Sequence, residues 1–330
     1  MKSLSTGTKI VAVLLVLFAL FPLVWPTDAW LGFGINILLM CVLAIGWNIS
    51  GGFGGMLSFG HAALFGTGAY AAAMFQLQAG LSPWVAAVAG VLCGALIGAF
   101  IGAVSFRYGL RGSYFSLVTL AFAEVLRVVA SSFDFMGGGS GLQLPLVQEW
   151  SSLQFPTRTE NYWFALVLVI VAILLSIWIK HSRFGAYLAA IRENEDASKA
   201  LGINTFRVKV AGMFAAGAVS AAAGVAYLQT FLYIDAPIAY GSVMSIEALL
   251  GATIGGAGTI LGPVLGTVLL HSVSELVKGV VGNATGLNLV FYGVLLLLIL
   301  RFMPNGVMGL FERIGARRST RNAGNSKEEA

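Results

Sequence analysis

Charged residues are scarce in this chain. Only 10% of its 330 residues are Asp, Glu, Lys or Arg, whereas 58% are hydrophobic. Soluble globular domains carry about 25% charged residues, so most of this chain has to face lipid or other apolar helices. The composition therefore excludes an ordinary soluble domain and predicts an integral membrane protein.

The sequence also lacks the short motifs that hold phosphates or metals. It contains no G-x-x-x-x-G-K-[ST] phosphate loop, so we do not expect the chain to hydrolyse ATP itself. Cys41 and Cys93 lie in separate apolar runs and the three histidines are scattered, so no metal and no cofactor is expected. We expect a protein that is not an enzyme.

Ten apolar runs follow one another along the chain, most of them close to the length of about 20 residues that crosses a bilayer as a helix. They predict an all-α, polytopic transmembrane helix bundle of about ten spans. Because the eighth and ninth runs are short and rich in glycine, we give the number as eight to ten. The runs are 10–24, 29–48, 58–77, 83–106, 114–133, 162–179, 210–232, 244–254, 260–277 and 287–302.

The basic residues predict which side of the membrane each loop faces. With the first residues in the cytoplasm and alternating spans, 16 Lys and Arg residues lie inside, 2 lie outside and Arg127 lies within a span. By the positive-inside rule, both ends and the segment 180–209 are then cytoplasmic, and the loop 134–161 is outside. We expect a multi-pass protein of the cell inner membrane, with run 10–24 as an uncleaved anchor.

A glycine-rich stretch occurs in each half of the chain. Gly51-Gly52-Phe53-Gly54-Gly55-Met56-Leu57 resembles Gly255-Gly256-Ala257-Gly258-Thr259-Ile260-Leu261, and each copy interrupts two apolar runs. Paired glycine-broken segments are the best sequence pointer to a transporter's central site. We therefore predict an internal pseudo-repeat whose helix breaks border the translocation path. The candidate residues are Asn48, Gly51, Gly52, Gly54, Gly55, Ser58, Gly255, Gly256, Gly258 and Gly262.

The cytoplasmic segment 180–209 carries an apolar stripe. Phe184, Tyr187, Leu188 and Ile191 recur at spacings of three and four residues, which predicts a short amphipathic helix. Gly202 follows, as is common past a helix end. Neighbouring acidic residues argue against a helix that floats on anionic lipid headgroups, so we interpret the segment as a docking element. The candidate coupling residues are Arg192, Glu193, Asn194, Glu195, Asp196, Ala197 and Gly202.

Four ionisable residues inside the predicted spans are further candidates, because charges within a membrane are costly and mark functional sites by default. Glu124 and Arg127 are three residues apart, so they can pair on one helix face. Such a pair can also be a brace between helices. Glu247 and Glu275 stand alone in their runs and either line a path or bond polar groups across helices.

Several stretches together resemble one transporter family. Arg192-Glu193-Asn194-Glu195, followed by Asp196-Ala197-Ser198 and Gly202, is similar to the coupling loop of LivM-type permease subunits of branched-chain amino acid ABC importers. That loop is a relaxed form of an EAA-x-x-x-G motif. Here Asp196 replaces Glu and Ser198 replaces Ala. The acid of the motif is therefore either Asp196 or, one residue earlier, Glu195. Both glycine-rich stretches and Arg111-Gly112-Ser113-Tyr114-Phe115 are similar to the same family, and the resemblance covers about residues 30–310.

The resemblance implies a permease subunit that moves leucine, isoleucine or valine into the cytoplasm while separate subunits hydrolyse ATP. The implied partners are a LivH-type second permease, two ABC ATPase subunits and a periplasmic amino-acid-binding protein, all in or at a lipid membrane. No nucleic acid is expected, because the basic residues lie at span ends. The permease domain would cover 1–312, including the coupling segment 180–209, and 313–330 would be a disordered cytoplasmic tail.

Two alternatives stay open at this point. The first is a permease of the same superfamily that carries urea or a short-chain amide. The second is a proton- or ion-coupled secondary transporter, in which Glu124, Glu247 and Glu275 would be the ion sites. The docking element argues against the second, because a secondary transporter needs no soluble partner.

Overall fold

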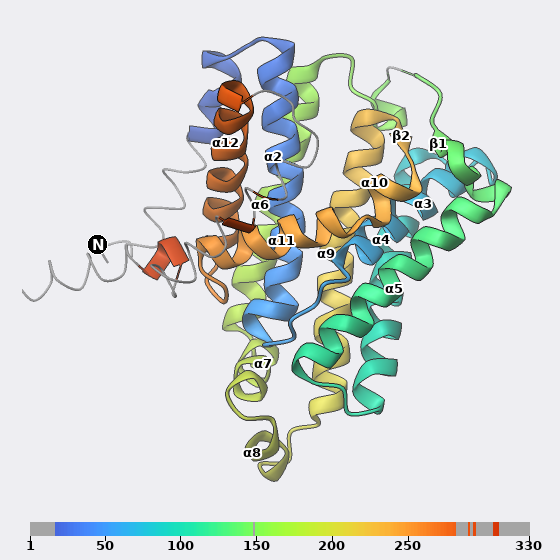
Figure 1. Cartoon of the computed structure of the whole chain (residues 1–330). Helices are drawn as coiled ribbons and strands as arrows, with labels where there is room; N and C mark the ends of the chain where they lie inside the picture. The colour runs from blue at the N-terminus through green and yellow to red at the C-terminus, as the bar shows by residue number, and fades with distance from the viewer. Residues whose placement is uncertain (1–16, 148, 282–289, 291–292, 295–305, 310–330) are drawn as a thin grey trace, which may run out of the picture.

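The structure is a computed structural model that describes residues 17–147, 149–281, 290, 293–294 and 306–309. Most of these residues are helical, and long helices pack side by side (Figure 1). Residues 17–24 of the first predicted run are helical. The rest of that run, most of the run 287–302 and the tail 313–330 lie outside the described residues.

The long helices follow the apolar runs. In chain order they are α2 (Asp28–Trp47), α3 (His61–Leu77), α4 (Pro83–Arg107), α5 (Gly112–Ser132), α6 (Arg158–His181), α9 (Thr205–Phe231), α11 (Ser242–Gly255) and α12 (Gly262–Val281). Three shorter helices are α7 (Arg183–Glu193), α8 (Glu195–Ala200) and α10 (Ala236–Tyr240). Figure 1 shows α7 and α8 projecting from one end of the bundle, and α11 running across the other long helices.

Six helical segments of the described residues are long and apolar enough to cross a membrane. The prediction of an all-α, polytopic membrane protein is therefore confirmed. The predicted count of eight to ten spans is not confirmed, because the described residues contain six candidate spans. One reason is that α3 begins three residues later than predicted, at His61, and has only 17 residues. The six segments are Asp28–Phe53, Pro83–Arg107, Gly112–Ser132, Arg158–His181, Thr205–Phe231 and Ala236–Gly255.

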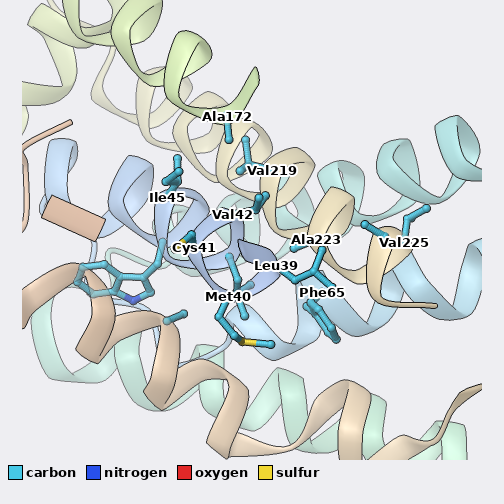
Figure 2. Packing of buried hydrophobic residues seen from close by; sticks show 14 of the residues in the cluster. Leu39, Met40, Cys41, Val42, Ile45, Phe65, Ala172, Val219, Ala223 and Val225 are labelled. Carbon is cyan, nitrogen blue, oxygen red and sulfur yellow. The ribbon is translucent and has the colours of Figure 1, made fainter. Parts of the chain in front are cut away.

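Helix α2 forms the centre of the bundle. It is apolar on all sides, as is typical of a helix enclosed by others, and fourteen of its 20 residues are buried. It packs against α6, α9, α11 and α12. Figure 2 shows Met40, Val42 and Ile45 of α2 in the cluster that also contains Ala172 of α6 and Val219 of α9. The first helix break lies at the end of this central helix.

Small residues let α9 approach α3 and α4 closely. A Cβ atom added at Gly217 would lie 2.6 Å from the carbonyl oxygen of Gly94, and one at Gly224 would collide with the carbonyl oxygen of Phe65. Helix packing in membranes relies on such residues, because lipid supplies no hydrophobic driving force between apolar helices. This close packing explains why 42 glycines are compatible with a helical chain.

The loop 134–161 contains short elements of its own. It holds the 3-10 helices η2 (Asp134–Met136), η3 (Gly138–Ser140) and η4 (Trp150–Ser152), and the strand β1 (Leu142–Gln143). Strand β1 pairs antiparallel with β2 (Tyr233–Ile234), with Leu142 opposite Ile234. This pairing fastens the loop to the α9–α10 connection, at the end of the bundle opposite α7 and α8 (Figure 1).

Candidate functional site

The first glycine-rich stretch widens the end of α2 into a π-helix, η1 (Asn48–Phe53). Single π-helical turns inside α-helices are rare and often mark functional sites. A Cβ atom at Gly51 would lie 2.6 Å from the indole ring of Trp47, so glycine is needed for this turn to close over the ring. The Trp47 indole Nε1 donates a hydrogen bond to the carbonyl oxygen of Ser58 at 2.8 Å, which holds the returning chain against the break.

The second glycine-rich stretch separates α11 from α12. Gly256 and Gly258 have φ angles of 118° and 82°, which side chains other than glycine rarely adopt. The Thr259 hydroxyl donates to the Gly256 carbonyl oxygen at 2.7 Å and accepts from the Gly262 N–H at 3.0 Å. The turn is therefore tight and ordered. Its backbone differs from that of η1, although both stretches interrupt two helices as predicted.

The two helix breaks touch each other through Asn48. Its side-chain Nδ2 donates to the Thr259 carbonyl oxygen, and its Oδ1 accepts from the Gly258 N–H, both at 2.8 Å. A Cβ atom at Gly52 would lie 2.5 Å from the Gly258 nitrogen. We call this contact, between residues 48–52 and 256–259, the glycine junction. It brings together segments about 200 residues apart, which the sequence pattern did not predict.

Two cations of the segment 180–209 reach the glycine junction. Arg192 Nη1 donates to the Gly52 carbonyl oxygen at 2.8 Å, and Lys180 Nζ donates to the Gly258 carbonyl oxygen at 3.3 Å. Carbonyl groups at helix ends lack partners within the helix and carry partial negative charge, so cations are favourable there. Arg192, a coupling candidate, therefore also binds the break inside this chain, while 40% of its side chain stays exposed.

Before Gly202 the segment folds as two helices, α7 and α8, where the sequence predicts one amphipathic helix. Leu188 and Ile191 of the apolar stripe are buried as expected, while Tyr187 is exposed. The break falls at Asn194, whose side-chain oxygen accepts from the backbone N–H groups of Asp196 and Ala197 at 3.0 and 2.9 Å. Asparagine is a strong N-cap residue, so it starts α8 in a new direction.

Gly202 ends α8 in the left-handed conformation that the sequence predicted, with a φ of 84°. The Gly202 N–H donates to the Lys199 carbonyl oxygen, and the Ile203 N–H donates to the Ser198 carbonyl oxygen. These two bonds make the Schellman arrangement, which favours glycine at this position. The turn brings the chain back toward α9.

Glu195 is enclosed by three cations. Its carboxylate lies 3.2 Å from Arg111 Nε, 3.2 Å from Lys199 Nζ and 3.1 Å from Lys209 Nζ. Lys209 also lies over the ring of Phe106, 4.3 Å from its centroid. Only 15% of the Glu195 side chain is exposed, so this residue fastens α8 to α5 and α9 rather than presenting a free charge.

The same contacts fix the charge of this cluster. Burial acts to raise the pKa of Glu195, but the hydrogen bonds from Lys209 and Lys199 and the charge of Arg111 outweigh it and lower that pKa. The hydrogen bond from Arg111 lowers the pKa of Asp196 as well. Both carboxylates are therefore ionised at neutral pH. Of the seven coupling candidates, Glu195 is half-buried and the other six are exposed.

The intramembrane candidates are spread over three helices. Glu124 and Arg127 form the predicted ion pair, with Arg127 Nη2 at 2.6 Å and Nε at 2.9 Å from the two carboxylate oxygens. Because both residues belong to α5, the pair does not brace two helices of this chain. Glu247 lies half-buried on α11, and Glu275 lies exposed on α12.

Sequence reasoning missed three cations of this site, namely Arg111, Lys180 and Lys209. In the sequence, Arg111 belongs to a stretch that resembles the family, and the two lysines are charges at span ends. Their pairing with Glu195 and Gly258 depends on how α5, α6 and α9 pack, and spacing along the chain carries no information about that.

These features define a multi-pass membrane protein in which two interrupted helices are hydrogen-bonded to a projecting polar segment. Residues 30–300 match the family model described as the branched-chain amino acid transport system permease component, and the chain belongs to this family. Its relatives are permease components of transport systems, not enzymes.

Curated relatives fall into two named groups. The chain is 23% identical to the high-affinity branched-chain amino acid transport permease LivM of Salmonella typhimurium, over 82% of this chain and 68% of that protein. It is 27% identical to LivH of Escherichia coli, over 81% of this chain and 90% of that protein. A probable LivM of Methanocaldococcus jannaschii is 27% identical, over 60% of this chain and 61% of that protein. The two kinds of permease in one family imply a transporter of several subunits. No solved structure matches this chain.

Proposed function

We propose that this chain is the transmembrane permease subunit of an ABC importer that carries branched-chain amino acids into the cytoplasm. The family and the names of both groups of relatives support the substrate class. The missing phosphate loop supports ATP hydrolysis by other subunits. The partners would be a LivH-type second permease, two ABC ATPase subunits and a periplasmic amino-acid-binding protein.

The proposal includes a topology of eight to ten spans over a permease domain of residues 1–312. Adding α3 and α12 to the six long apolar segments gives eight, and the runs 10–24 and 287–302 would give ten. The basic residues support placing both ends, the tail 313–330 and α7–α8 in the cytoplasm, with the protein in the inner membrane. A reagent that cannot cross the membrane should then label a cysteine introduced at position 150 but not one at 195 in intact cells; the opposite pattern contradicts this topology.

The ATPase would dock on α8 and its flanks. Leu201, with 82% of its side chain exposed, projects next to Ala197 and Ala200 at the tip of the segment. The same segment carries the exposed carboxylates of Glu193 and Asp196, which pair with Arg192 and Arg111. An interface of this kind depends on a few anchors with near-neutral contacts around them, and we assign Leu201 as one such anchor.

One observation carries the mechanism, namely the 2.8 Å hydrogen bond from Arg192 Nη1 to the Gly52 carbonyl oxygen. Arg192 lies on α7, next to the docking surface, while Gly52 lies in the break of the central helix. A displacement of α7 and α8 by the ATPases would move the arginine and so pull on the end of α2. Asn48 would pass the movement to the turn before α12, because it is hydrogen-bonded to Gly258 and Thr259.

Uptake by the purified complex in liposomes tests this function. We would reconstitute the chain with its second permease, the ATPases and the binding protein, and compare labelled leucine, urea and glutamate. The expected result is leucine uptake that requires both ATP and the binding protein. Uptake of urea in place of leucine would favour the amide alternative, and uptake driven by a proton gradient without ATP would overturn the ABC assignment.

A further inference from the structure

One face of α5 is left uncovered by the described part of the chain. Helix α5 is the least buried of the six candidate spans, with 28% of its apolar window buried against 39–72% in the others. Tyr114, Leu117, Glu124 and Val128 are exposed at helical spacing along this face. The uncovered face therefore includes a charged residue. Charged residues are rare on helix faces that contact lipid.

The charged pair on this face lies deep in the span. Glu124 is the thirteenth of the 21 residues of α5, roughly 18 Å from the start of the helix at 1.5 Å per residue. A hydrocarbon core about 30 Å thick places it near the middle rather than among headgroups. The Glu124 and Arg127 side chains remain 57% and 35% exposed, and charges are costly against lipid. Their surroundings in the assembled transporter should therefore be water or another polar group.

A largely apolar cavity lies along the same face of α5 and ends at Leu120, one helical turn before the pair. It has a volume of about 580 Å³ and is lined by apolar side chains of α5, α11 and residues 57–59, among them Phe59, Leu120 and Ile246, and by three serines. Leu120 lies one helical turn before Glu124. Helical side chains lean toward the N-terminus of their helix, so the Glu124 and Arg127 side chains lean toward this cavity. The cavity size is in the range of small-molecule sites.

We propose that Glu124 and Arg127 bind the carboxylate and ammonium groups of an apolar amino acid while its side chain occupies this cavity. An arginine side chain has five N–H donors and a carboxylate about four acceptor positions. The pair itself uses two of each. Arg127 can therefore donate to the substrate carboxylate and Glu124 can accept from the substrate ammonium without separation of the pair.

This site rests on the proposed function, and it explains how one subunit could contact a branched-chain amino acid. The substrate is a zwitterion with an aliphatic side chain, and the exposed face supplies an ion pair beside an apolar cavity. Because the face is open, the second permease subunit would close it from the other side. Binding would be weak, which suits a site from which the substrate must leave quickly.

Cysteine protection tests the proposal in the complete reconstituted complex. Cys41 and Cys93 are first replaced, and Leu120→Cys is introduced at the cavity. Leucine should slow the reaction of this cysteine with a water-soluble thiol reagent, and should not do so when Glu124→Gln and Arg127→Gln are also present. Gly139→Cys, at an exposed position of the loop 134–161, is the control that the reagent can reach and that leucine should not protect.

Leucine uptake by the parent complex and by a double variant distinguishes a failure of this binding site from a failure of the proposed function. The neutral double variant E124Q/R127Q leaves no unpaired charge in the membrane, so it should assemble normally with its ATPases. We expect its leucine uptake to fall about tenfold or more, the loss typical of hydrogen bonds to charged groups. If the parent complex takes up no leucine, the proposed function fails. If the parent transports leucine while the double variant transports equally well, or if leucine does not protect the cysteine at position 120, this site is overturned and the proposed function stands.

Discussion

The glycine junction and the tip of α8 both contain glycines, but for different physical reasons. At the junction, Cβ atoms on Gly52 and Gly258 would meet backbone and Arg192 atoms at 3.1 Å or less. At the tip, Gly202 has no atom of the described residues within 4 Å of its Cβ position and is needed only for its φ of 84°. The junction has no free volume, whereas the tip has a free surface. The first arrangement suits a part that transmits movement, and the second suits a part that receives a partner.

The largest effect is expected at the junction. Gly258→Leu would place a branched side chain where a Cβ atom already lies 2.8 Å from Arg192 Nη1, at a φ that leucine rarely adopts. Gly54→Leu, two residues beyond the junction, would press on the Ser50 carbonyl oxygen, 2.9 Å away. Both variants should abolish leucine uptake by the reconstituted complex, measured at equal amounts of permease.

Gly139→Leu is the matched control for these variants, because no atom of the described residues lies within 4 Å of its Cβ position and its φ is not positive. It should transport normally. Full uptake by both the Gly258→Leu and the Gly54→Leu variants would show that the glycine junction and its flank can accept bulk, and the contrast with the tip would be lost.

The next largest effect is expected at the tip, where conformation and not space is limiting. Gly202→Val forces a β-branched residue into the left-handed region, at a cost of about 1–2 kcal/mol. Helix α8 has only six residues, so the turn should shift. We expect about tenfold less ATPase to co-purify with the permease. Gly202→Asn should retain most of it, since asparagine tolerates this conformation; equal retention by both would contradict the role of the turn.

A smaller effect is expected where α8 is fastened to the bundle. Glu195→Gln keeps the shape of the side chain but removes a charge that faces Arg111, Lys199 and Lys209. ATPase retention and uptake should fall a few-fold. Asp196→Asn should change both less, because Asp196 is 75% exposed and exposed ion pairs contribute about 0–1 kcal/mol. The reverse order of the two variants would indicate that Asp196 itself contacts the ATPase.

The smallest effect is expected from pH. The pKa values of Glu195 and Asp196 are lowered from ordinary values of 4.5 and 3.8. The attachment of α8 is then fully stabilised above pH 4.5 and is lost as the pH falls through the lowered values. ATPase retention, followed by co-purification, should therefore be constant between pH 6 and 8. A midpoint of release near pH 6.5 would contradict this assignment of charges.

Helix positions could largely be predicted because they depend on local composition. The runs 83–106 and 162–179 became α4 and α6 with ends shifted by four residues or fewer. Helix α9 began five residues earlier than its run, because Asn204 caps it by accepting from the Arg207 N–H. Polar residues at caps extend a helix beyond the apolar run that reveals it.

The arrangement of the site could not be predicted in the same way. Both glycine-rich stretches were identified, but their contact through Asn48 is a tertiary feature that neither stretch encodes alone. The polar residues of the coupling segment were identified as a group. The cap at Asn194 then directs Arg192 inward to Gly52 and Glu195 inward to Arg111, while Asp196 remains outside. A single helix predicted over residues 184–200 does not distinguish these roles, because it places no change of direction at Asn194.

The central claim is that Arg192 transmits movement from the docking surface to the break in α2. The most direct test is the number of ATP molecules hydrolysed for each leucine transported by the reconstituted complex carrying Arg192→Gln. Arg183→Gln, a change at an exposed position at the start of α7, is the matched control. The account predicts that the Arg192 variant keeps its ATPases and hydrolyses ATP, while its uptake falls about tenfold or more through loss of a charged hydrogen bond, so the ratio rises about tenfold. An unchanged ratio with full uptake and bound ATPases would contradict it.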